Sequence, residues 1–235
     1  MVALPSLRWL PTRTQVHLAR ALTGLPVILV LAVAARFPFL PATGNLDDIA
    51  GLVQFGTQVA TAGPQTLYDP PDIHQTYYVL PPIFPFLLGF SYWLWAHAAH
   101  LITGLGPDGL LAPPFSLAAT FVKLWGIAAD LALGVVIYTW VERRYGRRWA
   151  AATAAAFLFQ PGVIYDSAFW GQIDSLVALC IASAILSLSD VRSTHSWLWL
   201  AAGMLVKPQA VLALPIVGVT TLLNRGPWAV ARGMA

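Results

Sequence analysis

The sequence predicts an all-α integral membrane protein built as a multi-pass bundle of helices. Of its 235 residues, 58% are hydrophobic and only 10% are charged, whereas a soluble domain carries about 25% charged residues. Long apolar runs alternate with short polar or basic segments, so the chain lacks the residues for a charged surface. The net charge of +3 is too small to indicate nucleic-acid binding, and the one cysteine, Cys180, excludes a disulfide framework. We interpret residues 1–235 as a single membrane domain.

The first predicted membrane helix covers residues 21–40. Arg8, Arg13 and Arg20 precede this apolar run, and basic residues favour the cytoplasmic side of a membrane. The run is long enough to span and is followed by no convincing small-residue cleavage site, so it reads as a membrane helix and not as a signal peptide.

Residues 41–115 are predicted to form one external loop that contains juxtamembrane helices. The apolar segment 82–102 is the weakest candidate for a span, because prolines crowd its start and tryptophans and histidines follow. If it crossed the membrane, the basic segment 142–148 would face outside, against the positive-inside rule. We therefore expect segment 82–102 to lie along the outer surface.

The remaining spans follow from the same orientation. Residues 117–141 cross inward, 149–165 cross outward and 173–189 cross inward again. The last apolar region, 197–223, is interrupted by Lys207-Pro-Gln209, and either half is shorter than the roughly 20 residues needed to span. Since a proline kinks or breaks a helix, this region is either one kinked helix or a hairpin.

The segment from Gln160 to Ser175 is unusually polar for its position between two apolar runs. Polar residues at a membrane boundary are tolerated where they line a cavity or reach water, which makes them candidates for a functional site. A plain polar turn between two helices is the alternative. The predicted topology places this segment on the same external side as Asp47 and Asp48, so we expect the two regions to converge.

Four short elements follow one another along the chain: Asp48 with Phe55 seven residues later, Tyr77-Tyr78 before Pro81-Pro82, Lys123 with Asp130, and Pro161–Ser175 with Lys207-Pro-Gln209. In this order they resemble the GT-C-fold glycosyltransferases, membrane enzymes that take sugars from polyprenyl-phosphate carriers. The fold of that family has juxtamembrane helices in its first external loop, and its members are commonly longer than this chain. The sequence therefore resembles an N-terminal module, either part of a longer enzyme or one half of a split system.

The resemblance implies a hexosyltransferase of the mannosyltransferase kind. It would move a mannose-like hexose from a polyprenyl-phosphate-linked donor to a hydroxyl of a glycan, lipid or protein acceptor. The active site would face the extracytoplasmic side of a bacterial inner membrane, with a partner membrane subunit in a split system. The family's tyrosine-proline-proline element also makes Tyr78 a candidate substrate-binding residue.

Asp48 is the candidate catalytic base. Sugar transfer needs a base near the acceptor hydroxyl, and the external loop is where the acceptor is presented. Asp47 is the alternative catalytic residue, because repulsion between adjacent carboxylates makes one of them a better proton acceptor. Either acid could instead cap a helix that begins at Ile49.

Two lysines are candidates for binding the departing phosphate. Lys123 and Lys207 lie in apolar runs, where an unpaired charge costs at least about 2.5 kcal/mol. Asp130 lies two helical turns from Lys123 on the same face and could orient it, although Lys123 could also extend to the headgroups. Beside Lys207, Pro208 frees backbone groups and Gln209 adds hydrogen-bond donors.

The external turn supplies candidates for sugar recognition. Trp170 and Tyr165 could stack on a sugar ring, while Gln172, Asp166 and Asp174 could bind its hydroxyls. The two acids could instead hold a divalent metal ion, as paired acids do in some relatives. With few further acids nearby, no cofactor or tightly bound metal is expected.

Two other classes of function compete with the transferase. A secondary transporter also has proline-broken helices with a charge inside the membrane, and Lys207-Pro-Gln209 would then be its substrate site. A non-catalytic, lipid-binding membrane subunit is the third class.

Overall fold

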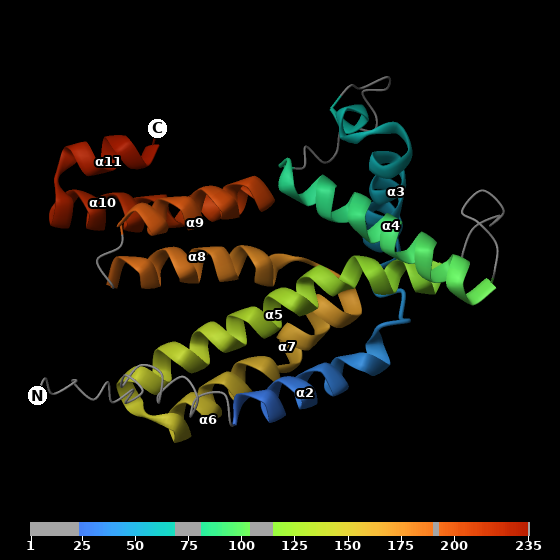
Figure 1. Ribbon diagram of the computed structural model, residues 1–235, viewed down its shortest axis with the longest axis horizontal. Helices are drawn as coiled ribbons and strands as arrows, with labels where there is room; N and C mark the ends of the chain where they lie inside the picture. Colours follow the sequence, from blue (N-terminus) through green and yellow to red (C-terminus); the bar gives the residue numbers. More distant parts are fainter. Residues whose placement is uncertain (1–23, 69–80, 104–114, 190–192, 235) are drawn as a thin grey trace, which may run out of the picture.

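A computed structural model describes residues 24–68, 81–103, 115–189 and 193–234, and within these ranges all regular structure is helical (Figure 1). The all-α prediction is therefore confirmed for the described part of the chain. The helical elements are α2 (Leu25–Arg36), η1 (Phe37–Phe39), α3 (Leu46–Ala62), η2 (Pro64–Leu67), α4 (Ile83–Thr103), α5 (Phe115–Tyr145), α6 (Arg147–Leu158), α7 (Pro161–Ile164), η5 (Tyr165–Trp170), α8 (Asp174–Ser189), α9 (Ser193–Val206), η6 (Pro208–Ala213), α10 (Leu214–Arg225) and α11 (Pro227–Met234).

One helix in the described ranges, Leu117–Tyr145 within α5, is long and apolar enough to cross a bilayer. Two shorter apolar helices cover Leu25–Phe39 and Asp174–Leu188. The predicted span 149–165 is not one helix, since α6 has 12 residues and therefore a length of about 18 Å. Pro161 starts the separate helix α7, where the side chain of Gln160 accepts a hydrogen bond from the Val163 N–H.

Helix α5 is the central element and contacts α2, α3, α4, η5, α6 and α8. Gly146, at φ +82°, turns the chain back from α5 into α6, because only glycine adopts such a conformation without strain. At Gly134 a methyl group would lie 2.7 Å from Leu158 Cδ1, so α5 and α6 approach closely. Tyr138 and Ala150 are buried in the apolar cluster that joins this pair to α2.

Helices α9 and α10 run in opposite directions, with the reversal at Lys207 (Figure 1). Of the two alternatives for region 197–223, the structure has the hairpin. Lys207 is extended at φ −146° and ψ 137°, as expected for a residue that precedes a proline. Across the hairpin, a methyl group on Gly203 would lie 3.0 Å from Ala210 Cβ, so the two arms pack tightly.

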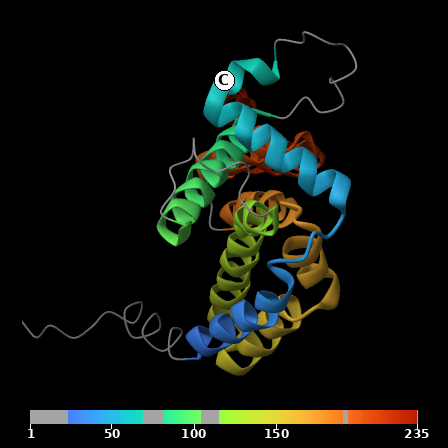
Figure 2. The same cartoon turned by 90° about the vertical axis from the view of Figure 1, so that its right-hand side faces the viewer.

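Helices α3 and α4 cross over the end of the bundle at which α5 begins (Figures 1 and 2). They pack against each other where Gly56 faces Leu88: a methyl group on Gly56 would lie 2.6 Å from the Leu88 carbonyl oxygen. The α5–α6 turn, with Arg143, Arg144, Arg147 and Arg148, lies at the opposite end of α5 (Figure 1). The start of α3 thereby reaches the end of the bundle where α8 begins and α9 ends.

Candidate functional site

Asp48 and the polar segment before α8 meet at this end of the bundle, as the sequence leads us to expect. The Trp170 Nε1–H donates a hydrogen bond of 2.7 Å to Asp48 Oδ2. Gln172 Nε2 donates to the same oxygen at 3.4 Å. Trp170 and Gln172 thus bind the same carboxylate oxygen of Asp48, a residue more than 120 positions earlier in the chain.

The first turn of α3 separates the environments of the two neighbouring acids. The helix begins at Leu46 with Asn45 at its N-cap, and the Ile49 N–H donates to the Asn45 carbonyl at 3.0 Å. The capping alternative is therefore wrong, because the helix begins three residues earlier than expected. Both carboxylates lie in the first turn, where the helix dipole favours negative charge. Asp47 is exposed and Asp48 is partly buried.

Lys207 is the cation of this cluster. Its ammonium forms an ion pair with Asp174 and donates to Gln172 Oε1 at 3.4 Å. The lysine side chain is 17% exposed and the Asp174 side chain 58%. The Gln172 amide therefore lies between Asp48 and Lys207, with its nitrogen toward the carboxylate and its oxygen toward the ammonium.

A turn of π-helix places these side chains. Element η5 ends at Trp170 and is followed by its C-cap Gly171, whose φ of +87° is the left-handed conformation. The N–H groups of Gly171 and Gln172 both donate to the Asp166 carbonyl at 2.9 Å. The left-handed turn requires glycine, and Gly171 also lies close to α3, since a methyl group there would lie 2.4 Å from Ile49 Cδ1.

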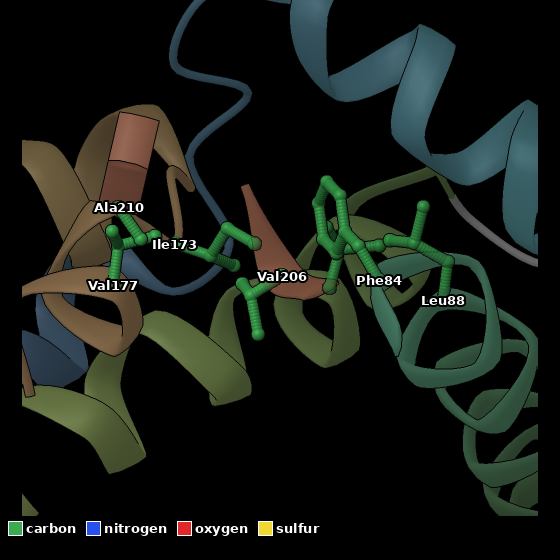
Figure 3. Packing of buried hydrophobic residues seen from close by; sticks show 7 residues of the cluster. Phe84, Leu88, Ile173, Val177, Val206 and Ala210 are labelled. Carbon is green, nitrogen blue, oxygen red and sulfur yellow. The ribbon is translucent and has the colours of Figure 1, made fainter. Parts of the chain in front are cut away.

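A buried apolar cluster includes the sequence neighbours of the polar residues (Figure 3). Ile173 separates Gln172 from Asp174, and Val206 precedes Lys207, so each polar side chain is adjacent to a buried anchor. The cluster joins α4, α5, α8 and the α9–η6 junction, and its buried members are Phe84, Leu88, Val122, Ile173, Val177, Val206 and Ala210.

Asp166 shares the electrostatic environment of Asp174 and Lys207. Burial raises the pKa of Asp166 from its ordinary 3.8 to about 6; the charges of Asp174 and Asp130 add to this rise and that of Lys207 opposes it. Asp166 can therefore exist in both protonation states near neutral pH, and can donate or accept a hydrogen bond.

Asp130, expected to bind substrate, is fully buried and is bound by the protein itself. Arg36 donates to Asp130 Oδ2 from Nε at 3.1 Å and from Nη2 at 2.9 Å. Ser167 Oγ donates to the same oxygen at 2.5 Å, and the Ser175 hydroxyl donates to Oδ1. The expected pairing with Lys123 is not formed, because Arg36 occupies the carboxylate.

Lys123 is also fully buried and caps the end of the first helix. Its ammonium donates to the carbonyl of Phe39 at 3.0 Å, to that of Leu40 at 3.4 Å and to that of Ala42. A cation is favourable at the carbonyl end of a helix. Neither expectation for Lys123, binding of a phosphate or extension to the headgroups, describes this position.

The remaining candidates lie at the edge of the site or outside the described residues. Tyr165 stacks on Phe169 with ring centroids 5.2 Å apart, and its ring lies edge-on to Trp170 at 6.0 Å. Gln209 is exposed at the start of η6. Tyr78 lies outside the described residues. In the part of the chain that the structure describes, no three His, Cys, Asp or Glu side chains are grouped as metal ligands would be.

Sequence reasoning missed the residues that hold the site in place. Arg36 lies inside the predicted helix 21–40 and is the one charged residue of that run, while Ser167 and Ser175 read as polar turn residues. The signal that could have found them is that Arg36 and Asp130 are opposite charges within apolar runs, and each needs a partner there.

Comparison with known protein families, curated proteins and solved structures finds no match.

Proposed function

We propose that this chain is the N-terminal module of a GT-C-type membrane glycosyltransferase. It moves a mannose-like hexose from a polyprenyl phosphate to an acceptor hydroxyl on the extracytoplasmic face. The observation that supports the proposal is the link from Asp48 through the Gln172 amide to Lys207. One side-chain amide thereby separates a carboxylate from a cation, and an indole is hydrogen-bonded to the carboxylate.

These groups match the charges that develop during sugar transfer. Asp48 takes the proton of the acceptor hydroxyl as its oxygen attacks the anomeric carbon of the donor. The bond from that carbon to the phosphate oxygen breaks, and the lipid phosphate leaves with the electron pair. Lys207 neutralises the leaving phosphate, which competes with Asp174 for the ammonium. Trp170 and Gln172 hold Asp48 toward the reacting hydroxyl.

A multi-pass arrangement in the membrane is part of the same proposal. Large apolar side chains are exposed on α2 and on the α9–α10 hairpin; Val30 is 67%, Leu212 77% and Leu223 79% exposed. Exposed apolar surface of this kind marks a membrane or protein contact. With the α5–α6 arginines in the cytoplasm, the start of α3 and the site lie on the external side.

A secondary transporter is the second candidate, and one observation favours it. Lys207 interrupts the helix between α9 and α10, as the substrate sites of transporters with broken helices do. A transporter would carry a solute without breaking its bonds, so the two candidates differ in the chemical fate of the sugar.

Transfer of label from a defined donor tests the proposal. The protein in nanodiscs is incubated with tritiated mannosyl-phosphodecaprenol and a lipid and glycan extract of its source cells. Wild-type protein should move the label to an acceptor, and Asp48→Asn should lower the rate by about 10²-fold or more, since the base is lost. Asp47→Asn, the matched change at the exposed neighbour, should have a small effect. No transfer by the wild-type chain in the presence of its partner subunits, or equal rates for wild type and Asp48→Asn, would contradict the proposal.

A further inference from the structure

The buried carboxylate of Asp130 joins four separate parts of the chain. Arg36, at the end of α2, holds one side of it through two hydrogen bonds and also donates to the Ala32 carbonyl at 3.0 Å. Ser167, in η5, and Ser175, in the first turn of α8, hold the other side. Arg36, Asp130 and Ser167 are each at most 1% exposed, so this network lies away from solvent.

We propose that Asp130, held by Arg36, is a positioning residue that fixes Trp170 and Gln172 against Asp48. The functional part of this inference rests on the proposed transferase, because it assigns Asp48 as the base. The geometric part stands without it.

The two serines bracket the segment that carries the site. Ser167 lies three residues before Trp170, and Ser175 lies three residues after Gln172. Each hydroxyl donates to a different oxygen of the one Asp130 carboxylate. Both ends of the segment 168–174 are thereby fixed to the same point on α5, and the side chains between them reach Asp48.

The same face of α5 touches the segment a second time. Gly126 lies one turn before Asp130, and a methyl group there would lie 2.3 Å from the Gln172 carbonyl oxygen and 3.3 Å from Ser167 Cβ. Residues four apart lie on one face of a helix. This face of α5 therefore holds segment 168–174 in two ways. The close approach at Gly126 sets the distance between the segment and the helix, and the Asp130 carboxylate fixes where along the helix the segment lies.

Stability alone is a weak reason for such a network. A buried ion pair pays a large desolvation penalty, and replacing both partners by apolar residues of similar size is often neutral or stabilising. Removing one partner is strongly destabilising, because a buried charge is left alone. Removal of both charges together thus separates a positioning role from a contribution to folding.

The experiment uses the double variant Arg36→Met/Asp130→Leu in the full chain. The indole N–H vibration in the ultraviolet resonance Raman spectrum reports hydrogen bonding, and subtraction of the spectrum of Trp170→Phe isolates the Trp170 band. In wild-type protein this band should show a strong hydrogen bond to Asp48. In the double variant it should shift to the position of a weakly bonded indole, while the melting temperature stays near the wild-type value. The transfer rate should fall by about 10²-fold, because Trp170 and Gln172 no longer hold Asp48 in position.

Serine variants test the same point with the ion pair left intact. Ser167→Ala combined with Ser175→Ala should shift the Trp170 band in the same direction. Ser196→Ala is the matched control, since Ser196 is a buried serine in α9 whose hydroxyl has no hydrogen-bond partner among the described residues, and it should leave the band in place. An unchanged Trp170 band in the serine double variant would overturn the inference, even where Arg36→Met/Asp130→Leu fails to fold. A shifted band in these variants, together with no sugar transfer by the wild-type protein, would support positioning and contradict the transferase proposal alone.

Discussion

Asp47 and Asp48 are neighbours in sequence, yet the fold gives them different surroundings. Successive residues of a helix point in directions about 100° apart, so one carboxylate can face the π-helical turn while the other faces solvent. Asp48 accepts hydrogen bonds from Trp170 and Gln172, and Asp47 is exposed. The orientation of α3 therefore distinguishes two residues that the sequence left as alternatives.

Asp166 should make stability depend on pH in a definite direction. Its folded-state pKa of about 6 is above the ordinary 3.8, so between these values the folded protein binds the proton that the unfolded chain has lost. Stability therefore falls as pH rises from 4 to 6, and the full penalty is present above 6. Asp166→Asn removes the penalty, which is about 1 kcal/mol once solvent screening of a half-exposed group is allowed for. Thermal melts should show the Asp166→Asn variant higher in Tm than wild type by roughly 2–4 °C at pH 7.5, with no difference below pH 4. A difference that stays constant across this range would contradict the assignment.

Sequence reasoning located the site residues that stand out chemically from their surroundings. Trp170, Gln172 and Asp174 are polar between apolar runs, and Lys207 is a charge inside one; the structure brings all four into contact with one another or with Asp48. Lys123 stands out equally but is bound to backbone carbonyls. A sequence does not show which carbonyl groups will lie near a lysine, and hence the role of Lys123 could not be read from it.

Helix α5 holds in place the segments that carry the candidate site. Its Lys123 holds the end of α2–η1, its Gly126 contacts the Gln172 carbonyl and its Asp130 holds two serines. Three positions within eight residues thus fix three other segments. A rigid helix is better suited to this than a loop, because a site tolerates only small errors in geometry.

Gly126→Ala should disturb the site more than a helical glycine usually does. Alanine normally stabilises a helix by roughly 0.5–1 kcal/mol relative to glycine, but here the new methyl group would lie 2.3 Å from a backbone oxygen. We expect a loss of roughly 1–3 kcal/mol in the free energy of unfolding, together with a lower transfer rate. Gly218→Ala in α10 is the matched control, because no atom of the described residues lies within 4 Å of its added methyl group. Denaturant titration of both variants decides the point; equal stability of the two would show that α5 is not in close contact with Gln172.

The order of helices could be predicted better than their ends and breaks. Hydrophobic runs predicted helices over 21–40, 117–141 and 173–189, and the structure has α2, α5 and α8 there. Pro208 indicated the break after α9. The π-helical turn η5 could not be predicted, since it depends on Asp130 and Gly171 holding the segment in place.

For the molecule as a whole, composition and the long apolar runs were enough to predict the helical structure that the described residues have. They did not predict the lengths of the helices: α6, α8 and α9 have 12, 16 and 14 residues, fewer than the roughly 20 needed to cross a bilayer. The multi-pass arrangement is a proposal that combines α5, the shorter apolar helices and the exposed apolar side chains.

The proposed base and the proposed phosphate-binding cation come from different parts of the molecule. Asp48 lies on α3, which crosses the end of the bundle, whereas Lys207 lies at the tip of the α9–α10 hairpin. They touch the same amide from opposite sides, so each can be altered without removing the other.

Parallel measurement of donor binding and sugar transfer in Asp48→Asn and Lys207→Met is the most direct test of this site. Both variants are placed in nanodiscs with tritiated mannosyl-phosphodecaprenol, and the dissociation constant and transfer rate are measured on the same samples. Asp48→Asn should bind the donor as wild-type protein does and lose transfer, because only the base is changed. Lys207→Met should weaken binding by at least about tenfold, or about 1.4 kcal/mol, because the phosphate loses its cation. Unchanged donor affinity in Lys207→Met together with full transfer by Asp48→Asn would contradict the assignment of this site.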